Sequence, residues 1–201
     1  MASRDAAPIS APAPDADPDW PLVQSLQGGD DGALDSLMER HREGLFRFVY
    51  RYVENEAIAA DLVQETFVRA YFKITQYRPQ AKFVTWLYRL ALNLCRDHAR
   101  SAAARAAKRT EPLPAEGQSE GKFDDALRST TPAQAAESSE EVARLHEVIQ
   151  TLPHDLKTAL ILSALEQRPQ QECAELLGTT PKAVETRVYR ARKLLRAALR
   201  L

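Results

Sequence analysis

KFVTWLYRLALNLCRDHARS, residues 82–101, has the periodicity of a long amphipathic helix. At about 100° per residue, apolar side chains return to one face of such a helix every three or four positions. The residues on this core-facing stripe are Phe83, Leu87, Leu90, Ala91 and Leu94. We therefore expect a helix from about Lys82 to Ser101 that packs one side against other helices.

The opposite face of this helix combines three arginines with a tryptophan and an asparagine. It collects Thr85, Trp86, Arg89, Asn93, Arg96 and Arg100. Arginines hold phosphates, an indole stacks on an unpaired base, and an asparagine side chain reads a base edge. This mixture favours a single-stranded or melting nucleic acid over a closed duplex. The alternative that stays open is a solvated arginine face, with Trp86 packed against a neighbouring helix.

Two more helices are predicted before residue 82. Asp30 or Asp31 can cap the first, whose apolar face carries Leu34, Leu37, His41, Leu45, Val49 and Tyr52. Asn55 can cap the second, whose inward residues are Ile58, Leu62, Phe67, Tyr71 and Ile74. The stretch Tyr77-Arg78-Pro79-Gln80 ends this helical pattern, because a proline disfavours helix in the residue before it.

The C-terminal part of the chain predicts a helix-turn-helix. Ser138 and Glu141 form a capping box before a stripe of Val142, Leu145, Ile149 and Leu152. Pro153 begins the next helix, to about Leu165. Pro169 then suits the first turn of a short helix that ends at Leu177, with Gly178 as its stop. Thr180 can cap a last, basic helix that opens with Pro181, which completes the motif.

The chain divides into four segments. Residues 1–18 are rich in Ala, Pro and Asp and are expected to be disordered, and residues 19–105 form a helical domain. Residues 106–137 mix Pro, Gly, Ser and charge without periodicity, which predicts a flexible linker, and residues 138–201 form a second helical domain. Neither domain has a convincing alternating strand pattern. The prediction is an all-α protein of two small helical domains.

The distribution of charge indicates which end of the chain meets nucleic acid. The whole chain has a net charge of −1, with 44% hydrophobic and 27% charged residues, as in folded globular proteins. Its last twenty residues hold seven basic side chains against Glu185 alone, whereas the first twenty and the linker are acidic. This asymmetry is typical of a chain that meets phosphate through only part of its surface.

Several classes of protein do not fit. The two cysteines, Cys95 and Cys173, lie far apart in apolar helical patterns and predict buried thiols, and His98 near Cys95 has no second pair to complete a metal site. We expect no cofactor. The sequence shows neither a membrane-spanning stretch nor a secretory signal, so we expect a cytoplasmic protein. The four histidines are scattered, and no paired carboxylates or phosphate-binding glycine loop appear, so an enzyme is not expected.

Three motifs in order resemble those of one protein family. DLVQETFVRAY, residues 61–71, resembles conserved region 2.2 of bacterial sigma factors, and FVTWLYRLALN, residues 83–93, resembles regions 2.3 and 2.4 of their extracytoplasmic-function (ECF) group. Leu152-Pro153, residues 175–178 (ELLG) and residues 184–195 resemble region 4 of that group. The linker is too short for a region 3 domain, as in this small group. The resemblance implies a sigma factor, which lets RNA polymerase find and open a promoter.

The resemblance also implies partners. Asp61, Gln64, Glu65 and Arg69 would face the clamp helices of the polymerase β′ subunit. Asp61, Gln64, Glu65 and Val68 lie on the side of their helix away from the apolar face and are therefore available to a partner. The alternative is that Glu65 and Arg69 form a surface i,i+4 ion pair worth only tenths of a kcal/mol. The other implied partners are the polymerase β flap, promoter DNA and an anti-sigma protein.

In the first domain the resemblance implies contacts to the −10 element. The loop from Tyr77 to Lys82 would form a pocket for a flipped base, Asn93 would help to line or read it, and Trp86 would support strand separation. The full set of −10 candidates is Tyr77, Arg78, Lys82, Trp86, Arg89, Asn93, Arg96 and Arg100. The linker would pass toward the RNA exit channel.

In the second domain the helix from Pro181 to Leu199 would enter the major groove of the −35 element. It buries Val184, Val188, Ala191, Leu195 and Leu199, and its outward candidates are Lys182, Glu185, Thr186, Arg187, Tyr189, Arg190 and Lys193. This sequence departs from the pattern of the group at three places. Glu185 stands where the group commonly carries Lys or Arg. Residues 168–171 (RPQQ) replace the usual apolar-Ser-aromatic-Glu entry to the short helix, and Cys173 replaces an aliphatic residue. These departures leave the −35 sequence open.

A free-standing helix-turn-helix regulator is the competing interpretation. It would bind duplex operators as a dimer and would explain residues 153–201. It leaves the Trp86 and Asn93 face and the acidic helix around Gln64 and Glu65 without a role. Gel filtration with core polymerase separates the two, because only a sigma factor co-elutes.

Overall fold

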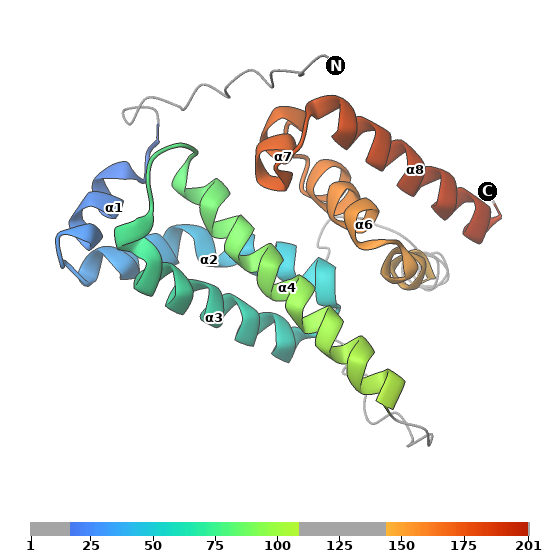
Figure 1. The fold of residues 1–201 in the computed structure, drawn as a ribbon, viewed down its shortest axis with the longest axis horizontal. Coiled ribbons are helices and arrows are strands. Elements are labelled where there is room, and N and C mark those ends of the chain that lie inside the picture. Colours follow the sequence, from blue (N-terminus) through green and yellow to red (C-terminus); the bar gives the residue numbers. More distant parts are fainter. Residues whose placement is uncertain (1–16, 109–143, 201) are drawn as a thin grey trace, which may run out of the picture.

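The computed structural model describes residues 17–108 and 144–200, and every regular element in these two ranges is helical. They form an N-terminal body (17–108) and a C-terminal body (144–200), shown in Figure 1. The predicted all-α class with two helical regions is confirmed. Residues 1–16 of the predicted tail, most of the predicted linker and the predicted capping box of Ser138 and Glu141 lie outside the described residues.

The N-terminal body is built from four helices. They are α1 (Trp20–Gln27), α2 (Gly32–Val53), α3 (Glu56–Lys73) and α4 (Phe83–Lys108), with a 3₁₀ turn η2 (Ile74–Gln76) after α3. The side chain of Asn55 accepts a hydrogen bond from the Ile58 amide at 3.0 Å, so the predicted cap of α3 is confirmed. α2 packs on α1, α3 and α4. Phe48, Leu45 and Leu87 are fully buried between them and form the centre of the core.

The N-terminal body begins earlier than the sequence predicted. Helix α1 was not predicted, and Asp17, which was expected in a disordered tail, is buried. The Asp17 carboxylate accepts hydrogen bonds from the amides of Phe83, at 2.6 Å, and Asp19, at 3.1 Å. At the other end, α4 continues to Lys108, so the predicted linker boundary at residue 106 falls within a helix.

The C-terminal body contains the predicted helix-turn-helix. Residues 144–151 are helical and are followed by α6 (His154–Leu160), a π-helical turn η3 (Ile161–Leu165), α7 (Gln170–Leu177) and α8 (Pro181–Leu199). Gly178 ends α7 with φ of 60°, a left-handed conformation that favours glycine. The Thr180 hydroxyl accepts from the Ala183 amide at 3.2 Å and caps α8. Both predicted signals are confirmed.

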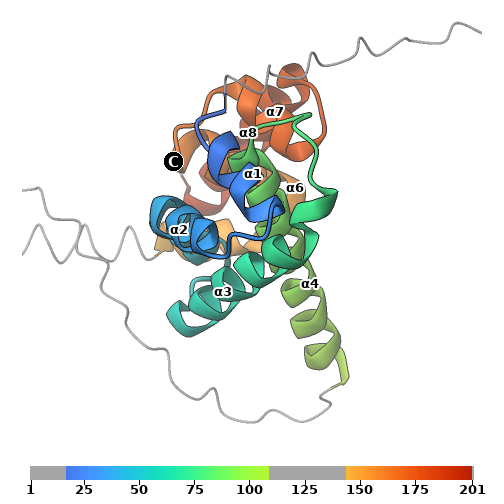
Figure 2. The ribbon, with the colours of Figure 1, turned by 90° about the vertical axis from the view of Figure 1, so that its left-hand side faces the viewer.

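The two bodies pack directly against each other. α4 contacts α7 and the end of α2 contacts η3, and Figures 1 and 2 show the C-terminal helices stacked on one side of the α1–α4 bundle. One cluster of buried apolar side chains runs through both bodies and includes Tyr88 on one side and Ile161 on the other. Both cysteines are buried free thiols, and burial raises the pKa of Cys95 to about 12 and that of Cys173 to about 11.

Three residues lie differently from their predicted positions. Thr85, placed on the outer arc of α4, is only 1% exposed, because α4 is covered by α2, α3 and α7 rather than on one side alone. His41, placed on an apolar stripe, instead contacts the Asp19 carboxylate at 2.7 Å. Tyr71, predicted to point inward, is exposed, and its hydroxyl donates to Asp31 at 3.0 Å.

Candidate nucleic-acid and protein interfaces

The outer face of α3 presents the predicted polymerase-binding residues to solvent. Asp61, Gln64 and Glu65 are exposed, and Arg69 is partly exposed. Arg69 Nε lies 2.7 Å from Glu65 Oε1, so the i,i+4 ion pair considered as the alternative does form. Both partners are roughly 40% exposed or more, at 41% and 46%. The pair therefore adds little stability, and it leaves the face open to a partner.

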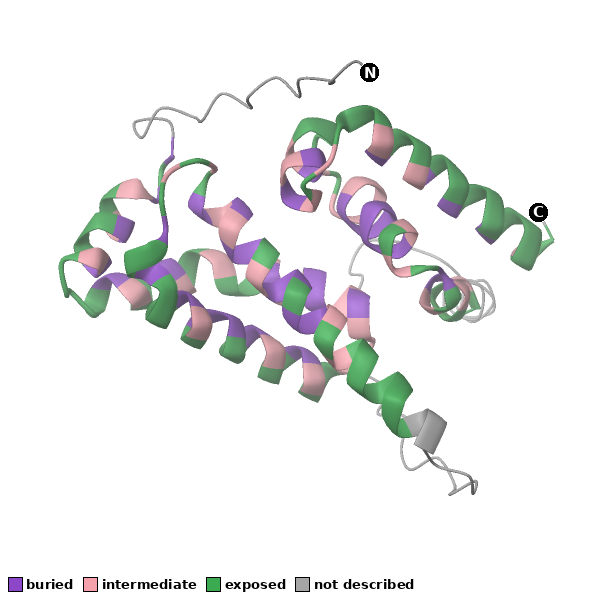
Figure 3. Cartoon of the chain, viewed as in Figure 1, coloured by how far each residue is buried: buried purple, intermediate pink, exposed green. Residues whose placement is uncertain are grey.

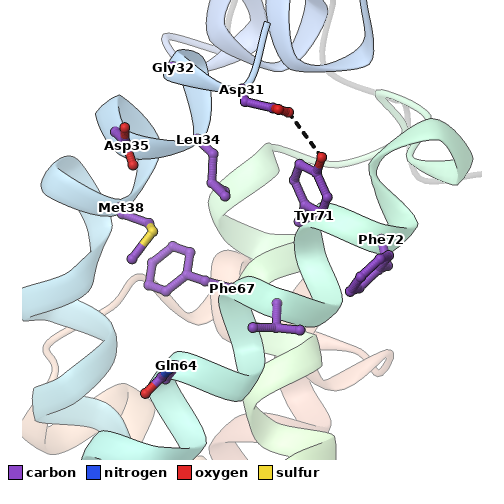
Figure 4. Close-up of a pocket in the computed structure, with 10 residues that line it drawn as sticks. Asp31, Gly32, Leu34, Asp35, Met38, Gln64, Phe67, Tyr71 and Phe72 are labelled. Atoms are coloured by element: carbon purple, nitrogen blue, oxygen red, sulfur yellow. Dashed lines mark hydrogen bonds between the residues drawn. The ribbon is translucent and has the colours of Figure 1, made fainter. Parts of the chain in front are cut away.

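A groove of about 510 Å³ continues this face toward α2, as Figure 4 shows. Gln64, Phe67, Val68 and Phe72 line its α3 side, and α2 supplies Leu34 and Met38. Phe72 is 74% exposed, which is unusual for a phenylalanine. Sequence analysis missed this groove, although Val68 and Phe72 are spaced i,i+4 and could have marked an apolar strip beside Gln64.

The outer face of α4 holds most of the predicted −10 residues. Asn93, Arg89 and Arg100 are exposed. Trp86 is half-buried and packs on two aromatic rings, with its centroid 5.2 Å from Tyr77 and 5.8 Å from Phe83. The alternative for Trp86 was packing against a neighbouring helix. Trp86 does pack on other side chains, but these are Tyr77 of the loop and Phe83 of its own helix.

The loop between η2 and α4 has two exposed cations and a buried tyrosine. Arg78 and Lys82 reach solvent, whereas Tyr77 is only 3% exposed. The Tyr77 hydroxyl donates to the Ala81 carbonyl at 2.6 Å. Burial, reinforced by nearby carboxylates, raises the pKa of Tyr77 well above its usual range. Tyr77 therefore supports the loop from inside and does not lie on its surface, in contrast to its predicted place among the DNA-contacting residues.

The outer face of α8 is exposed along its length, as the green ribbon in Figure 3 shows. The exposed candidates are Lys182, Glu185, Thr186, Tyr189, Arg190 and Lys193. Lys182 Nζ lies 2.7 Å from Glu185 Oε2, and Tyr189 is 68% exposed. Arg187 is only partly exposed and lies 3.6 Å from Asp155 of its own body. The buried side follows the prediction, except that Leu199 is only partly buried.

The contact between the two bodies engages part of the α4 face. The Arg89 guanidinium donates to the backbone carbonyl of Glu175 on α7. Arg96 lies 3.7 Å from Asp155, and the Arg168 guanidinium lies 4.1 Å from the centre of the Tyr88 ring. Two of the predicted phosphate-contacting arginines are therefore held by the C-terminal body in this arrangement.

The end of α2 contributes the second half of this contact. Arg51 pairs with Glu166 and donates to the Leu165 carbonyl at 3.1 Å. The Tyr52 hydroxyl lies 2.6 Å from Nδ1 of His154, and Lys157 Nζ lies 4.6 Å from the centre of the Tyr52 ring. Burial lowers the pKa of Lys157 to about 8, and burial together with nearby cations lowers that of His154.

The described residues contain neither a group of acids, histidines and cysteines able to hold a metal ion nor a helix long and apolar enough to cross a membrane. Three exposed faces carry the candidate residues: the acidic and apolar face of α3, the arginine face of α4 and the basic face of α8. They lie on three different helices of one chain.

Comparison with known proteins gives consistent matches. Residues 37–105 match the family model for Sigma-70 region 2, and residues 142–195 match that for Sigma-70 region 4. The chain is 31% identical to RNA polymerase sigma-H factor of Pseudomonas aeruginosa, over 90% of this chain and 93% of the relative. It is 33% identical to ECF RNA polymerase sigma-E factor of Haemophilus influenzae, over 88% and 93%.

Solved structures resemble the fold across both bodies. CnrH in complex with the cytosolic domain of CnrY has a TM-score of 0.62 at 27% identity, covering 89% of this chain and 94% of that one. The sigma factor RpoE from Bartonella quintana, in complex with the anti-sigma factor NepR, has a TM-score of 0.60 at 17% identity. It covers 83% of this chain and 96% of that one.

Proposed function

The chain belongs to the ECF group of RNA polymerase sigma factors, and we propose how its surfaces share the work of promoter recognition. It is a transcription initiation factor. A free-standing helix-turn-helix regulator is not favoured, because the relatives match both bodies in the same order and not the C-terminal body alone. The family is one of DNA-binding initiation factors and not of enzymes.

The α3 face binds core polymerase. Asp61, Gln64, Glu65 and Arg69 contact the β′ clamp, and the adjoining groove at Val68 and Phe72 adds an apolar contact. An exposed apolar strip beside charged and polar side chains is the composition expected of a protein interface with a polar rim. The exposure of Phe72 supports this assignment, because its side chain is 74% exposed even with its edge-on ring contact to Tyr71.

The α4 face binds the −10 element. Arg89, Arg96 and Arg100 hold phosphates, Asn93 reads a base edge, and Trp86 stacks where the strands part. Arg78 and Lys82 bring two more cations from the loop, which would receive a flipped base. The single observation that carries this assignment is the exposed Asn93, which lies between arginines on the outer side of a helix in the matched region 2.

The α8 face binds the −35 element in the major groove, with Lys182, Glu185, Thr186 and Tyr189 nearest to the bases. Arg187, Arg190 and Lys193 contact phosphates beside them. The exposure of this face and the helix-turn-helix of α7 and α8 support the assignment. The same body would also meet the polymerase β flap.

The packing of the two bodies supports weak promoter binding by the free chain. Arg89 and Arg96 contact Glu175 and Asp155, so in the packed arrangement these contacts compete with phosphates for both guanidiniums. Core polymerase, by binding the bodies apart, would release them. Tight and sequence-specific promoter binding by the free protein at physiological salt would argue against this assignment.

Two further properties follow from the family. An anti-sigma protein is an expected partner, since CnrH was solved in complex with the cytosolic domain of CnrY and RpoE from Bartonella quintana with the anti-sigma factor NepR. We expect the chain to work in the cytoplasm, where the polymerase acts.

The experiment that tests the −10 assignment is permanganate footprinting of thymines near the start site with reconstituted holoenzyme. Trp86→Ala combined with Asn93→Ala is expected to spare promoter docking and to impair strand opening. Arg144→Ala removes an exposed arginine that belongs to none of the three faces and serves as the control. Normal opening by the double variant would remove the α4 face from the mechanism.

A further inference from the structure

The first described segment of the chain, residues 17–27, touches both ends of the loop 77–82. Its start contacts the first residue of α4 and its end contacts the backbone that enters the loop. This segment precedes the residues matched by the region 2 model, which begin at residue 37. Its contacts therefore lie outside the residues that the region 2 model matches.

Asp17 caps α4 from a distance of 66 residues in sequence. The first amides of a helix have no partner within the helix, and Lys82, the residue just before Phe83, has no side-chain acceptor to offer. Asp17 supplies the acceptor at 2.6 Å, and its negative charge suits the positive end of the helix dipole. The outgoing end of the loop is thereby fixed to the N-terminal segment.

Gln27 fixes the incoming end. Its side-chain amide donates to the carbonyl of Ile74 at 2.8 Å and to that of Tyr77 at 3.2 Å. Tyr77 then packs on Trp86, one of the proposed −10 residues, with ring centres 5.2 Å apart. The segment is thus connected to the proposed DNA-contacting face through one hydrogen-bonded backbone and one ring contact.

The segment itself is anchored on α2. Asp19 is 1% exposed and receives Arg40 at 2.6 Å and His41 at 2.7 Å, while Arg40 also donates to the Pro18 carbonyl. The Asp19 carbonyl accepts from the Val23 amide and starts α1. The start of the segment 17–27 is therefore fixed to α2 by ion pairs and hydrogen bonds. Its contacts with the loop 77–82 can for this reason hold the loop in one position.

We infer that Asp17 and Gln27 are positioning residues for −10 recognition, which hold the loop 77–82 and the first turn of α4 in the geometry that receives the unpaired strand. This inference rests on the proposed −10 function of the α4 face. Neither residue touches DNA. Both act by keeping Tyr77 and Trp86 at fixed distances and the loop backbone preformed, so that binding does not have to order it.

The test measures binding of a fluorescent single-stranded −10 oligonucleotide to reconstituted holoenzyme carrying Asp17→Ala or Gln27→Ala. We expect each variant to weaken binding about fivefold, the equivalent of one lost helix cap, with affinity for core polymerase unchanged. Asn55→Ala is the matched control, because it removes the cap of α3 at 3.0 Å without contacting the loop. Asp17→Asn keeps one oxygen that can accept from the Phe83 amide. We therefore expect it to bind the oligonucleotide more tightly than Asp17→Ala and more weakly than wild type.

The outcomes are distinct. The inference is supported if Asp17→Ala and Gln27→Ala bind the oligonucleotide more weakly than wild type. Asn55→Ala should lose as much folding stability as they do and still bind the oligonucleotide normally. Equal binding by Asp17→Ala, Gln27→Ala and the control overturns the inference, as does an equal loss in all three. If Trp86→Ala with Asn93→Ala also binds normally, the −10 assignment itself fails. Should Asp17→Ala not fold, Gln27→Ala, at a partly exposed site, decides alone.

Discussion

Glu185→Lys should change which −35 sequence is preferred more than it changes overall affinity. Glu185 is exposed on the outer face of α8, one turn before the exposed Tyr189. A carboxylate in this position repels phosphate, so its presence in a basic helix needs a reason. One reason is a hydrogen bond accepted from a cytosine amino group. The other is the ion pair with Lys182 at 2.7 Å, which would orient the lysine.

The structure sets the size of the second effect. Lys182 is 80% exposed and Glu185 is 53% exposed, so their pair is worth about 0.3–0.5 kcal/mol at most. Loss of that pair alone would change affinity by about twofold, equally for every −35 sequence. Loss of a base contact would instead cost about 1–3 kcal/mol, or roughly fivefold to more than a hundredfold, at one base pair only.

A binding-site selection with wild-type and variant holoenzyme, compared position by position, separates the two effects. The base-reading role predicts that Glu185→Lys disfavours cytosine and favours another base, such as guanine, at a single position. Lys182→Ala removes the ion pair, together with any base contact of Lys182 itself, and leaves Glu185 in place, so a position that changes in Glu185→Lys but not in Lys182→Ala belongs to Glu185. Identical selected motifs from wild type and Glu185→Lys would refute the base-reading role, and a uniform shift shared with Lys182→Ala would assign Glu185 to the pair.

Three other perturbations test the remaining surfaces. Gln64→Ala with Glu65→Lys should lower affinity for core polymerase while stability changes by under about 0.5 kcal/mol; normal core binding would exclude this face. Arg168→Ala removes the cation above Tyr88 and should loosen the packing of the two bodies. We expect it to raise the affinity of the free chain for a single-stranded −10 oligonucleotide about two- to fivefold and to leave the affinity of holoenzyme unchanged. Unchanged affinity of the free chain would contradict the idea that packing of the bodies weakens its DNA binding. Asp19 is buried, which by itself raises its pKa, but hydrogen bonds from His41 and Arg40 hold that pKa below the ordinary value. Its stabilisation is therefore complete at neutral pH and lost as the pH falls below about 4, so Asp19→Asn should lower stability by about 2 kcal/mol at pH 7 and progressively less in acid; a pH-independent difference in thermal unfolding would rule this out.

Local signals in the sequence were sufficient to predict most helices of the two bodies. The apolar stripe through Leu87 and Leu94 predicted α4, and the cap at Thr180 with the stop at Gly178 predicted the helix-turn-helix, because these signals act over three or four residues. Helix α1 was missed although Pro21 in its first turn is a helix-start signal. Asp19 stands before the helix but does not cap it, because its carboxylate pairs with Arg40 and His41 of α2.

The parts of the site that sequence could not supply depend on contacts between distant segments. The exposure of Asn93 follows from the helical period, but the burial of Thr85 required knowledge of the helices on either side of α4. Tyr77 lies in a loop, where most residues are exposed, yet it packs beneath Trp86. Asp17 caps a helix that begins 66 residues later in the sequence, and no local sequence pattern predicts such a cap.

Arg89 lies where two alternative partners compete for one guanidinium. In the packed arrangement it is held by the Glu175 carbonyl, and in the proposed working complex it holds a phosphate. Any substitution in α7 or η3 that improves the packing of the two bodies raises the thermal stability of the free chain and subtracts the same free energy from promoter binding. Variants selected for heat resistance should therefore lose transcriptional activity when their changes fall in this contact, and keep it when they fall elsewhere.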